Sequence, residues 1–219
     1  MFFARTARLQ IRAVDTSDGP AWLRIRSEYA VLSSSTFGYV VPPGPSTWEH
    51  NKKWLEDALF AGFVEVKEEF AHLRRVLPDE EGNDPEPPKE ESEKHIQWER
   101  RQRAVGFVLL TVPPKNRDAQ LGLLFSTSWH NLGLGTELMR WLVPYAFEQL
   151  GMHRLSLEVV ESNVAARRVY QKVGFAEEGR KKGAVWQDGG WKDIVLMAIL
   201  EEEYWAGRNR HTVNATSTI

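Results

Sequence analysis

The chain carries the stretch His130-Asn131-Leu132-Gly133-Leu134-Gly135-Thr136 between a strand-like apolar run, residues 121–125, and an amphipathic helical run. Two glycines at i and i+2 leave no Cβ in the way of a close ligand. The free N–H groups and the positive dipole end of the following helix would face that ligand. The stretch therefore favours an anion-binding turn suited to a phosphate. The alternative is that the two glycines only form a turn and bind no ligand, as in most Gly-x-Gly pairs.

A second segment, residues 154–175, has the pattern of a strand, a cap, a short helix and a glycine stop. Alternating Leu155, Leu157 and Val159 predict the strand. Asn163 is a good helix N-cap, and Gly174 lies where a C-cap glycine belongs. The helix between them has one apolar face, formed by Ala166, Val169, Tyr170 and Val173 at i, i+3, i+4 and i+7.

Together the two segments resemble the acyl-CoA core of the GNAT superfamily of N-acetyltransferases. The signatures of that family are (Arg/Gln)-x-x-Gly-x-(Gly/Ala) and Asn-x-x-Ala-x-x-x-Tyr-x-x-x-Gly-Phe. The first is matched at Gly133 and Gly135 but has His130 where the family usually has Arg or Gln. The second is matched at every fixed position, namely Asn163, Ala166, Tyr170, Gly174 and Phe175.

The resemblance covers most of the chain and implies the fold. Residues 9–15 resemble the family's first strand, 104–112 its third and 119–125 its fourth. Residues 179–200 resemble the last hairpin of the ribosomal-protein and small-amine branches. The implied fold is a single α/β (α+β) domain with a central, mixed, mostly antiparallel twisted sheet. That sheet is splayed between strands four and five and is flanked by about four helices.

Local signals add further elements. We expect a helix over residues 22–32 and a second helix from a capping box at Ser46-Thr47-Trp48-Glu49 to about Ala61. Residues 63–76 and 96–110 are predicted to form the strands of an extended hairpin. The acceptor wall is expected between the two helices, at residues 33–45, with Glu28, Tyr39, Trp48, Trp129 and Trp186 as candidates to shape an amine pocket.

Composition excludes several classes of protein. A length of 219 residues with 42% hydrophobic content suits one globular domain, placed at residues 1–205, with a polar C-terminal tail at 206–219. The absence of cysteine excludes a disulfide framework and a cysteine-based zinc site, and no metal is expected. No apolar run approaches the roughly 20 residues that span a bilayer, and a net charge of −2 gives no basic field. We therefore expect neither a membrane nor a nucleic acid as partner.

An acidic insertion lies at about residues 77–95. Residues 79–93 hold eight acidic residues and three prolines, a composition that cannot bury enough apolar area to offset chain ordering. We interpret it as a loop capping the hairpin between the second and third strands. It serves either as a solvated loop tip or as an attractor for a cationic substrate.

The N-terminus is open to two interpretations. Arg5, Arg8 and Arg12 precede the first acidic residue, Asp15, which is typical of a mitochondrial presequence. Alternation over residues 9–13 favours a first strand instead, whose removal would damage the sheet. We therefore expect a cytoplasmic protein, as a monomer or a homodimer.

The resemblance implies acetyl-CoA as the acyl donor and assigns residues to it. The amides of residues 131–136 would cradle the pyrophosphate at the N-terminus of a helix over about residues 133–150. The pantetheine arm would run beside the fourth strand. The predicted cofactor-binding residues are Phe125, Ser126, Thr127, His130, Asn131, Leu132, Gly133, Leu134, Gly135, Thr136, Asn163 and Tyr170.

Catalysis by this family needs a proton acceptor for the amine and a donor for the leaving thiolate. Gln120 stands where many members have a glutamate, and a neutral amide cannot act as a base. Glu158, twelve residues before Tyr170, is similar in placement to the base of ribosomal-protein alanine N-acetyltransferases, where a tyrosine is the acid. Glu158 and Tyr170 are therefore the candidate catalytic pair, with a water relay as the competitor to Glu158.

Three functions follow as alternatives. The first is transfer of acetyl from acetyl-CoA to a primary amine of a small molecule, by direct attack in a ternary complex. The second is acetylation of a protein N-terminus or a ribosomal protein, with the peptide N-terminus as acceptor. The third is a non-catalytic acyl-CoA-binding module that keeps Gly133 and Gly135 but has lost its acceptor chemistry.

Overall fold

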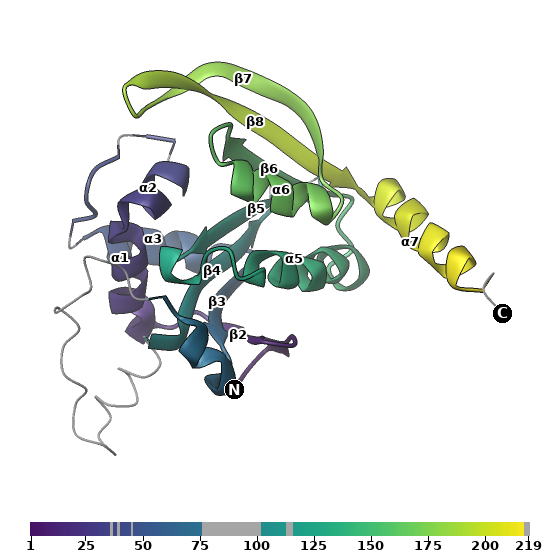
Figure 1. Cartoon of the computed structure of the whole chain (residues 1–219), viewed down its shortest axis with the longest axis horizontal. Helices are drawn as coiled ribbons and strands as arrows, with labels where there is room; N and C mark the ends of the chain where they lie inside the picture. Colours follow the sequence, from purple (N-terminus) through teal and green to yellow (C-terminus); the bar gives the residue numbers. More distant parts are fainter. Residues whose placement is uncertain (36, 39, 45, 76–101, 113–115, 217–219) are drawn as a thin grey trace.

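The computed structural model describes residues 1–35, 37–38, 40–44, 46–75, 102–112 and 116–216, with residues 209–216 described by their backbone alone. Within these residues eight strands form one sheet in the order β1-β2-β3-β4-β5-β6-β8-β7 (Figure 1). The strands are β1 (Ala4–Arg5), β2 (Leu9–Ala13), β3 (Phe60–Val66), β4 (Ala104–Thr111), β5 (Asp118–Phe125), β6 (Arg154–Val160), β7 (Ala176–Gln187) and β8 (Gly190–Leu200). The helices are α1 (Gly19–Ser27), α2 (Tyr29–Ser35), α3 (Thr47–Glu56), α5 (Leu134–Pro144), α6 (Val164–Lys172) and α7 (Glu201–Thr216).

The sheet is mixed and mostly antiparallel, as predicted. Parallel pairing occurs between β5 and β6, and every other neighbouring pair is antiparallel. The strand-to-helix crossover through α5 makes that pair parallel, because a parallel connection needs an intervening element long enough to return the chain. The fold class is confirmed.

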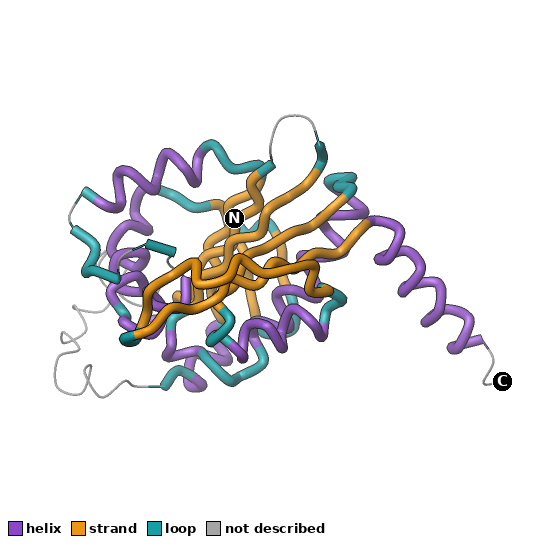
Figure 2. The backbone as a smooth tube through the Cα atoms, turned by 90° about the horizontal axis from the view of Figure 1, so that it is seen from above, coloured by secondary structure: helices purple, strands orange, loops and turns teal. Residues whose placement is uncertain are grey.

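Helices cover both faces of the sheet (Figures 1 and 2). On one face α5 and α6 pack on a large core that includes Leu138, Leu157 and Tyr170. On the other face α1 and α3 pack on a smaller core with Phe63 and Phe107, whose rings meet edge to face. Successive residues of a strand point to opposite faces, so β3 and β4 each contribute to both cores.

Two helix predictions need correction. The helix expected over residues 22–32 is two helices, α1 and α2, separated by an extended Glu28 with φ −68° and ψ 118°. The predicted capping box at Ser46 is wrong, since Ser46 is itself helical in backbone angles and its side chain makes no capping hydrogen bond. The helix that follows ends at Glu56, because Phe60 and Ala61 already pair with β4.

The long hairpin strands are also shorter than predicted. β3 begins at Phe60 and ends at Val66, and residues 68–73 form a 3₁₀ helix instead of continuing the strand. β4 begins at Ala104. The two strands do pair antiparallel, as expected for a hairpin. The acidic insertion lies outside the described residues.

The ends of the chain add elements that the sequence did not predict. A two-residue β1 precedes the expected first strand and pairs with it. The segment taken as a polar tail is helical as far as Thr216, in a helix that projects from the body of the molecule (Figure 2). No helix in the described ranges is both long and apolar enough to cross a membrane.

Candidate active site at the splay between β5 and β6

The N-terminus of α5 has the backbone geometry expected of the predicted anion cradle. Gly133 is the N-cap, with φ +76°, and Asn131 before it also has a positive φ of +61°. The first hydrogen bond that returns to this turn runs from the Glu137 N–H to the Gly133 carbonyl, at 3.0 Å. The amides of residues 134–136 lie in the first helical turn, where no carbonyl of the helix can accept from them. They remain available for an anion.

An arginine from a distant part of the chain holds this cradle in place. Arg8 donates through Nη1 to the Leu132 carbonyl at 2.9 Å and through Nε to Glu137 at 2.7 Å. The Arg8 N–H and the Thr6 hydroxyl also donate to Glu137. Partial burial alone would raise the pKa of Glu137, but these bonds and the Arg8 charge lower it overall. Arg8 thus neutralises a carboxylate that would otherwise repel a phosphate at this helix end.

Sequence reasoning missed the Arg8 clamp, because Arg8 and Glu137 lie 129 positions apart. The sequence treated Arg8 only as one of three arginines near the N-terminus. Arg12, another of them, is bonded to Asp18 and Glu65 inside the fold. The amide cradle is therefore supported by the Arg8 guanidinium, which no motif near residues 130–136 predicts.

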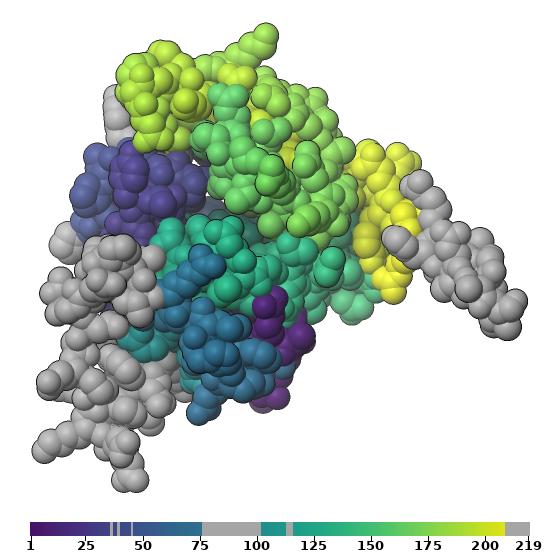
Figure 3. Space-filling view, viewed as in Figure 1, coloured from purple at the N-terminus to yellow at the C-terminus, as the bar shows by residue number. Residues whose placement is uncertain are grey.

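The sheet opens beside the cradle. β5 and β6 pair at three positions, Asp118 with Arg154, Ala119 with Leu155 and Gln120 with Ser156. Beyond Gln120, β5 continues to Phe125 with β4 as its partner, and β6 continues to Val160 with β8. The two strands therefore separate at the level of Glu158, which is the predicted splay. The surface is hollowed between the purple α1–α2 region and the green α5–α6 region (Figure 3).

The end of β5 is tied to the opposite face of the sheet. The carboxylate of Glu28 accepts from the Ser126 hydroxyl at 2.7 Å and from both the N–H and the hydroxyl of Thr127 at 2.6 Å. Ser126 is fully buried. The hydroxyls predicted to face the cofactor are engaged by Glu28, while Phe125 is partly buried against the α5–α6 core.

The other predicted cofactor residues lie around the helix end. Asn131 and His130 are exposed, Leu132 and Thr136 are half-buried, and Leu134 is buried and offers only its backbone. His130 Nε2 lies 3.1 Å from the carbonyl oxygen of Phe125. Asn163 caps α6, accepting from the Ala166 N–H at 3.1 Å. Cofactor contacts of these side chains stay predictions.

Tyr170 is placed by α6 on the face that carries α5. Its ring is 8% exposed and lies 5.7 Å from the ring of Phe175. Burial raises the pKa of Tyr170 to about 12. Among the described residues none hydrogen-bonds its hydroxyl. Tyr170 is therefore a neutral phenol with a proton to donate.

Glu158 lies on the other face of the sheet. Leu157 and Val159 point into the α5–α6 core, so the alternate residue Glu158 points toward the side of α1 and α2. Its carboxylate bonds the ammonium of Lys181 on β7, at 2.6 Å. The two predicted catalytic residues thus lie on opposite faces of the sheet.

The β7–β8 hairpin lies against α2 at one end of the α1–α2 face. Gln187 donates to the Ser33 carbonyl at 2.5 Å, and the Tyr29 hydroxyl donates to Asp188 at 2.8 Å. These bonds dock the hairpin tip on α2. Trp186, near the tip, is exposed and meets Trp191 edge to face at 5.5 Å.

Two tryptophans proposed for an amine pocket belong to the core instead. Trp129 is 1% exposed and donates to the Ala104 carbonyl at 3.0 Å. Trp48 is buried against Trp22. Glu28 is engaged by Ser126 and Thr127, as described above, and Tyr39 lies outside the described residues.

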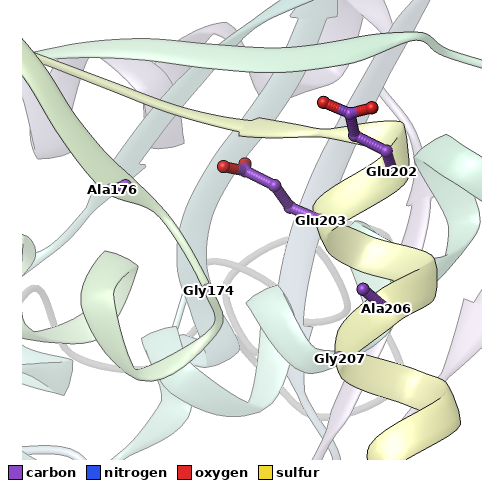
Figure 4. Close-up of a pocket in the computed structure, with 6 residues that line it drawn as sticks. All are labelled: Gly174, Ala176, Glu202, Glu203, Ala206 and Gly207. Carbon is purple, nitrogen blue, oxygen red and sulfur yellow. The ribbon is translucent and has the colours of Figure 1, made fainter.

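A separate hollow lies away from the splay, between the α6–β7 turn and α7 (Figure 4). It is lined by Gly174, Ala176, Glu202, Glu203, Ala206 and Gly207. None of the predicted cofactor or catalytic residues lines it. In the described ranges no group of three or more His, Cys, Asp or Glu side chains is arranged to hold a metal ion.

A strand-to-helix anion cradle beside a splayed sheet defines the class of acyl-CoA acetyltransferases. The model of the acetyltransferase (GNAT) family matches residues 48–175, more than half of the chain. The chain belongs to this family.

Its relatives act on different acceptors by name. YdaF of Bacillus subtilis, named a putative ribosomal N-acetyltransferase, is 32% identical over 42% of this chain and 50% of its own length. Spermidine N(1)-acetyltransferase of Escherichia coli K12 is 26% identical over 45% of this chain and 53% of its own length. The chain spans about half the length of these curated relatives.

Solved structures share the fold. Spermidine N-acetyltransferase from Vibrio cholerae, in complex with CoA and spermine, superposes with a TM-score of 0.65 at 20% identity. The match covers 90% of this chain and 98% of that one. A GNAT-family acetyltransferase from Bacillus anthracis gives a TM-score of 0.62 at 20% identity, over 92% and 99% of the two chains.

Proposed function

We propose that this protein transfers the acetyl group of acetyl-CoA to a primary amine of a small molecule, by direct attack in a ternary complex. The observation that carries the proposal is the splay between β5 and β6, with Tyr170 on one face and Glu158 on the other. A donor that enters from the α5 side meets an acceptor from the α1–α2 side in this opening. Holding both reactants there converts a bimolecular step into an effectively unimolecular one.

The residues at the cradle fit the donor. Amides 134–136 and the positive end of α5 would hold the pyrophosphate, and the β5 edge beyond Gln120 would pair with the pantetheine arm. Gly135 gives the phosphate close access to the backbone. His130, in place of the family's Arg or Gln, would contact a phosphate oxygen.

Two side chains would manage the protons. Glu158 would accept a proton from the acceptor ammonium, directly or through a water, so that the amine lone pair can attack the acetyl carbon. Tyr170 would donate to the sulfur as the C–S bond breaks. An ordinary thiol pKa is about 8.5, well below that of this phenol, so hydrogen-bond donation stabilises the thiolate even without complete proton transfer.

The docked hairpin supports a small acceptor over a peptide. Its bonds to α2 close one end of the acceptor face, whereas a protein N-terminus needs an open groove. A peptide N-terminus remains the second candidate. It is supported by the spacing of Glu158 and Tyr170 and by the similarity to YdaF.

The location that we propose is the cytoplasm. β2 lies between β1 and β3, paired with both. Cleavage of residues 1–12 as a presequence would remove most of this strand and the Arg8 clamp.

A thiol-release assay with acetyl-CoA tests the function directly. The panel would hold polyamines, amino acids, aminoglycosides and short peptides. Release with a small amine is the expected result. Release with peptides alone would favour the second candidate. Calorimetric binding of acetyl-CoA without release from any amine would instead show a non-catalytic binding module.

A further inference from the structure

The proposed base already holds an ammonium group from its own chain. Lys181 Nζ lies 2.6 Å from Glu158 Oε1, and among the described residues no other side chain bonds this carboxylate. Glu158 lies two residues beyond the last β5–β6 pair, where the strands separate. Lys181 therefore occupies the place that the proposed function gives to the acceptor ammonium.

Lys181 reaches this position across β8, next to an irregular part of β7. Lys181 pairs with Ile194 of β8, and Glu158 pairs with Leu196 of the same strand, so the lysine side chain crosses β8 diagonally. The β7–β8 register shifts directly after Lys181, and Gly183 has φ +54°. The lysine side chain is 52% exposed against 22% for Glu158. Solvent can thus reach the lysine, while the carboxylate is more sheltered.

We propose that Lys181 is a self-acetylation site, modified by the protein's own acetyl-CoA when no acceptor is present. This inference rests on the proposed function. Glu158 takes a proton from the Lys181 ammonium, and the freed lone pair forms an N–C bond to the acetyl carbonyl carbon. The C–S bond breaks and CoA leaves with its electron pair, taking a proton from the Tyr170 hydroxyl; the nitrogen loses its second proton through water, which restores the Tyr170 hydroxyl. The products are Nε-acetyl-lysine at Lys181 and free CoA thiol, and the proton on Glu158 returns to water.

Attachment to the same chain favours this reaction over that of a free lysine, because a tethered group acts at a high effective concentration. Lys182 provides a matched control. It is the adjacent residue, of the same type and also exposed. Chemical acetylation in solution would modify both lysines at similar rates.

The test incubates the full chain with acetyl-CoA alone and follows intact mass and mapped peptides over time. Lys181 is expected to gain one acetyl group at least about tenfold faster than Lys182, with a rate constant independent of protein concentration. Excess CoA should slow the reaction in the unaltered protein. Without added CoA, Glu158→Gln should acetylate Lys181 more slowly than the unaltered protein does. Lys181→Arg should show no acetyl group at that position.

Equal rates at the two lysines would overturn the inference. So would a Lys181 rate that rises with protein concentration or that ignores excess CoA. Turnover of a small amine without Lys181 acetylation would reject this inference and leave the proposed function standing. Lys181 acetylation in a protein that turns over no small amine would support the inference and reject the small-amine acceptor.

Discussion

The two faces of the sheet differ in how their parts of the site are built. On the α5–α6 face the proposed donor site comes from two short segments, residues 130–136 and 163–175, whose caps and glycines are local, with the Arg8 clamp as the one long-range support described above. On the α1–α2 face the site depends on contacts between distant residues. Ser126 lies 98 positions from Glu28, and Gln187 lies 154 positions from Ser33.

This difference corresponds to two requirements on the site. The donor is common to the family, whereas the acceptor differs between its members. A donor common to all members can be bound by local motifs, since the same amides suit the same phosphates. An acceptor that differs between members is met by elements that pack together only in the tertiary structure. Substitutions on the first face should therefore affect every acceptor alike, and substitutions on the second should affect acceptors selectively.

The largest effect is expected from Gly135→Glu on the donor face. The carboxylate would place bulk and negative charge at the cradle, so acetyl-CoA binding should be lost. Gly135→Ala is the matched control, because a Cβ there meets Val169 at an ordinary 3.9 Å. Calorimetry on both variants checks this. Unchanged affinity in a folded Gly135→Glu protein would remove the cofactor assignment.

Tyr170→Phe should lower kcat by roughly 10²- to 10⁴-fold while leaving acetyl-CoA affinity nearly unchanged. The ring that packs on Phe175 is kept, and only the proton donor is lost. Steady-state kinetics and calorimetry separate the two quantities. Tyr145→Phe, a change of the same kind away from the splay, should leave kcat as it is. If chemistry limits the rate and Tyr170→Phe keeps full turnover, the tyrosine is a core residue.

On the acceptor face, Glu158→Gln should lower kcat/KM by about 10- to 100-fold and flatten or shift the acidic limb of its pH profile. The change keeps the size of the side chain but removes the proton acceptor. Glu161→Gln, three residues further along the chain, serves as control and should preserve the limb. An identical limb in the Glu158 variant would place the titrating group elsewhere, for instance on the substrate amine.

The sequence predicted the local backbone of the α5–α6 face well and the long-range contacts of the α1–α2 face poorly, for a physical reason. Asn163, Gly133 and Gly174 act within a few residues, and such local signals can be recognised in the chain itself. Glu28 interrupts the predicted first helix, and its carboxylate bonds Ser126 and Thr127 across the molecule. No local signal near Glu28 announces those partners.

The errors at α3 and β3 have different origins. Ser46 has the residue type of a cap, yet its backbone is helical, with φ −76° and ψ −7°, and its side chain makes no capping hydrogen bond. β3 ends after Val66, where the Lys67 N–H bonds the Arg8 carbonyl and the chain turns into a 3₁₀ helix. At β3 a tertiary contact overrides a local preference.

A smaller effect is expected from Arg8→Gln. The Arg8 clamp joins the N-terminal strands to the cradle through bonds to a charged group, which are typically worth about 1.5–3 kcal/mol each. Acetyl-CoA should bind about tenfold more weakly, with kcat for every acceptor little changed. Binding calorimetry with acetyl-CoA and with acetyl-pantetheine shows whether the lost affinity comes from the pyrophosphate. Acetyl-pantetheine lacks a pyrophosphate, so Arg8→Gln should not weaken its binding.

The clamp also predicts a dependence of stability on pH. The pKa of Glu137 is lowered in the folded protein, so its stabilising effect is present above the unfolded pKa and is lost as pH falls through the folded one. Glu137→Gln should therefore reduce the loss of thermal stability on acidification. Melting temperatures of the two proteins across the acidic pH range measure this loss. If the melting temperature falls with pH equally in both, other carboxylates cause the loss of stability.

The smallest effect is expected from replacing residues 79–93 of the acidic insertion by a short Gly/Ser linker. Their composition offers little apolar surface, and loop closure depends weakly on length, so melting temperature and acetyl-CoA affinity should stay nearly unchanged. A polycationic acceptor should show a KM raised by about threefold at low salt, since the lost carboxylates attract it, and that difference should fade as salt screens exposed charges. A variant that keeps the full length of the insertion but changes its eight acids to Asn or Gln separates the effect of charge from that of length. Unfolding of the linker variant would contradict the interpretation of the insertion as a loop. A KM change that does not depend on salt would indicate direct contact with the acceptor instead of long-range attraction.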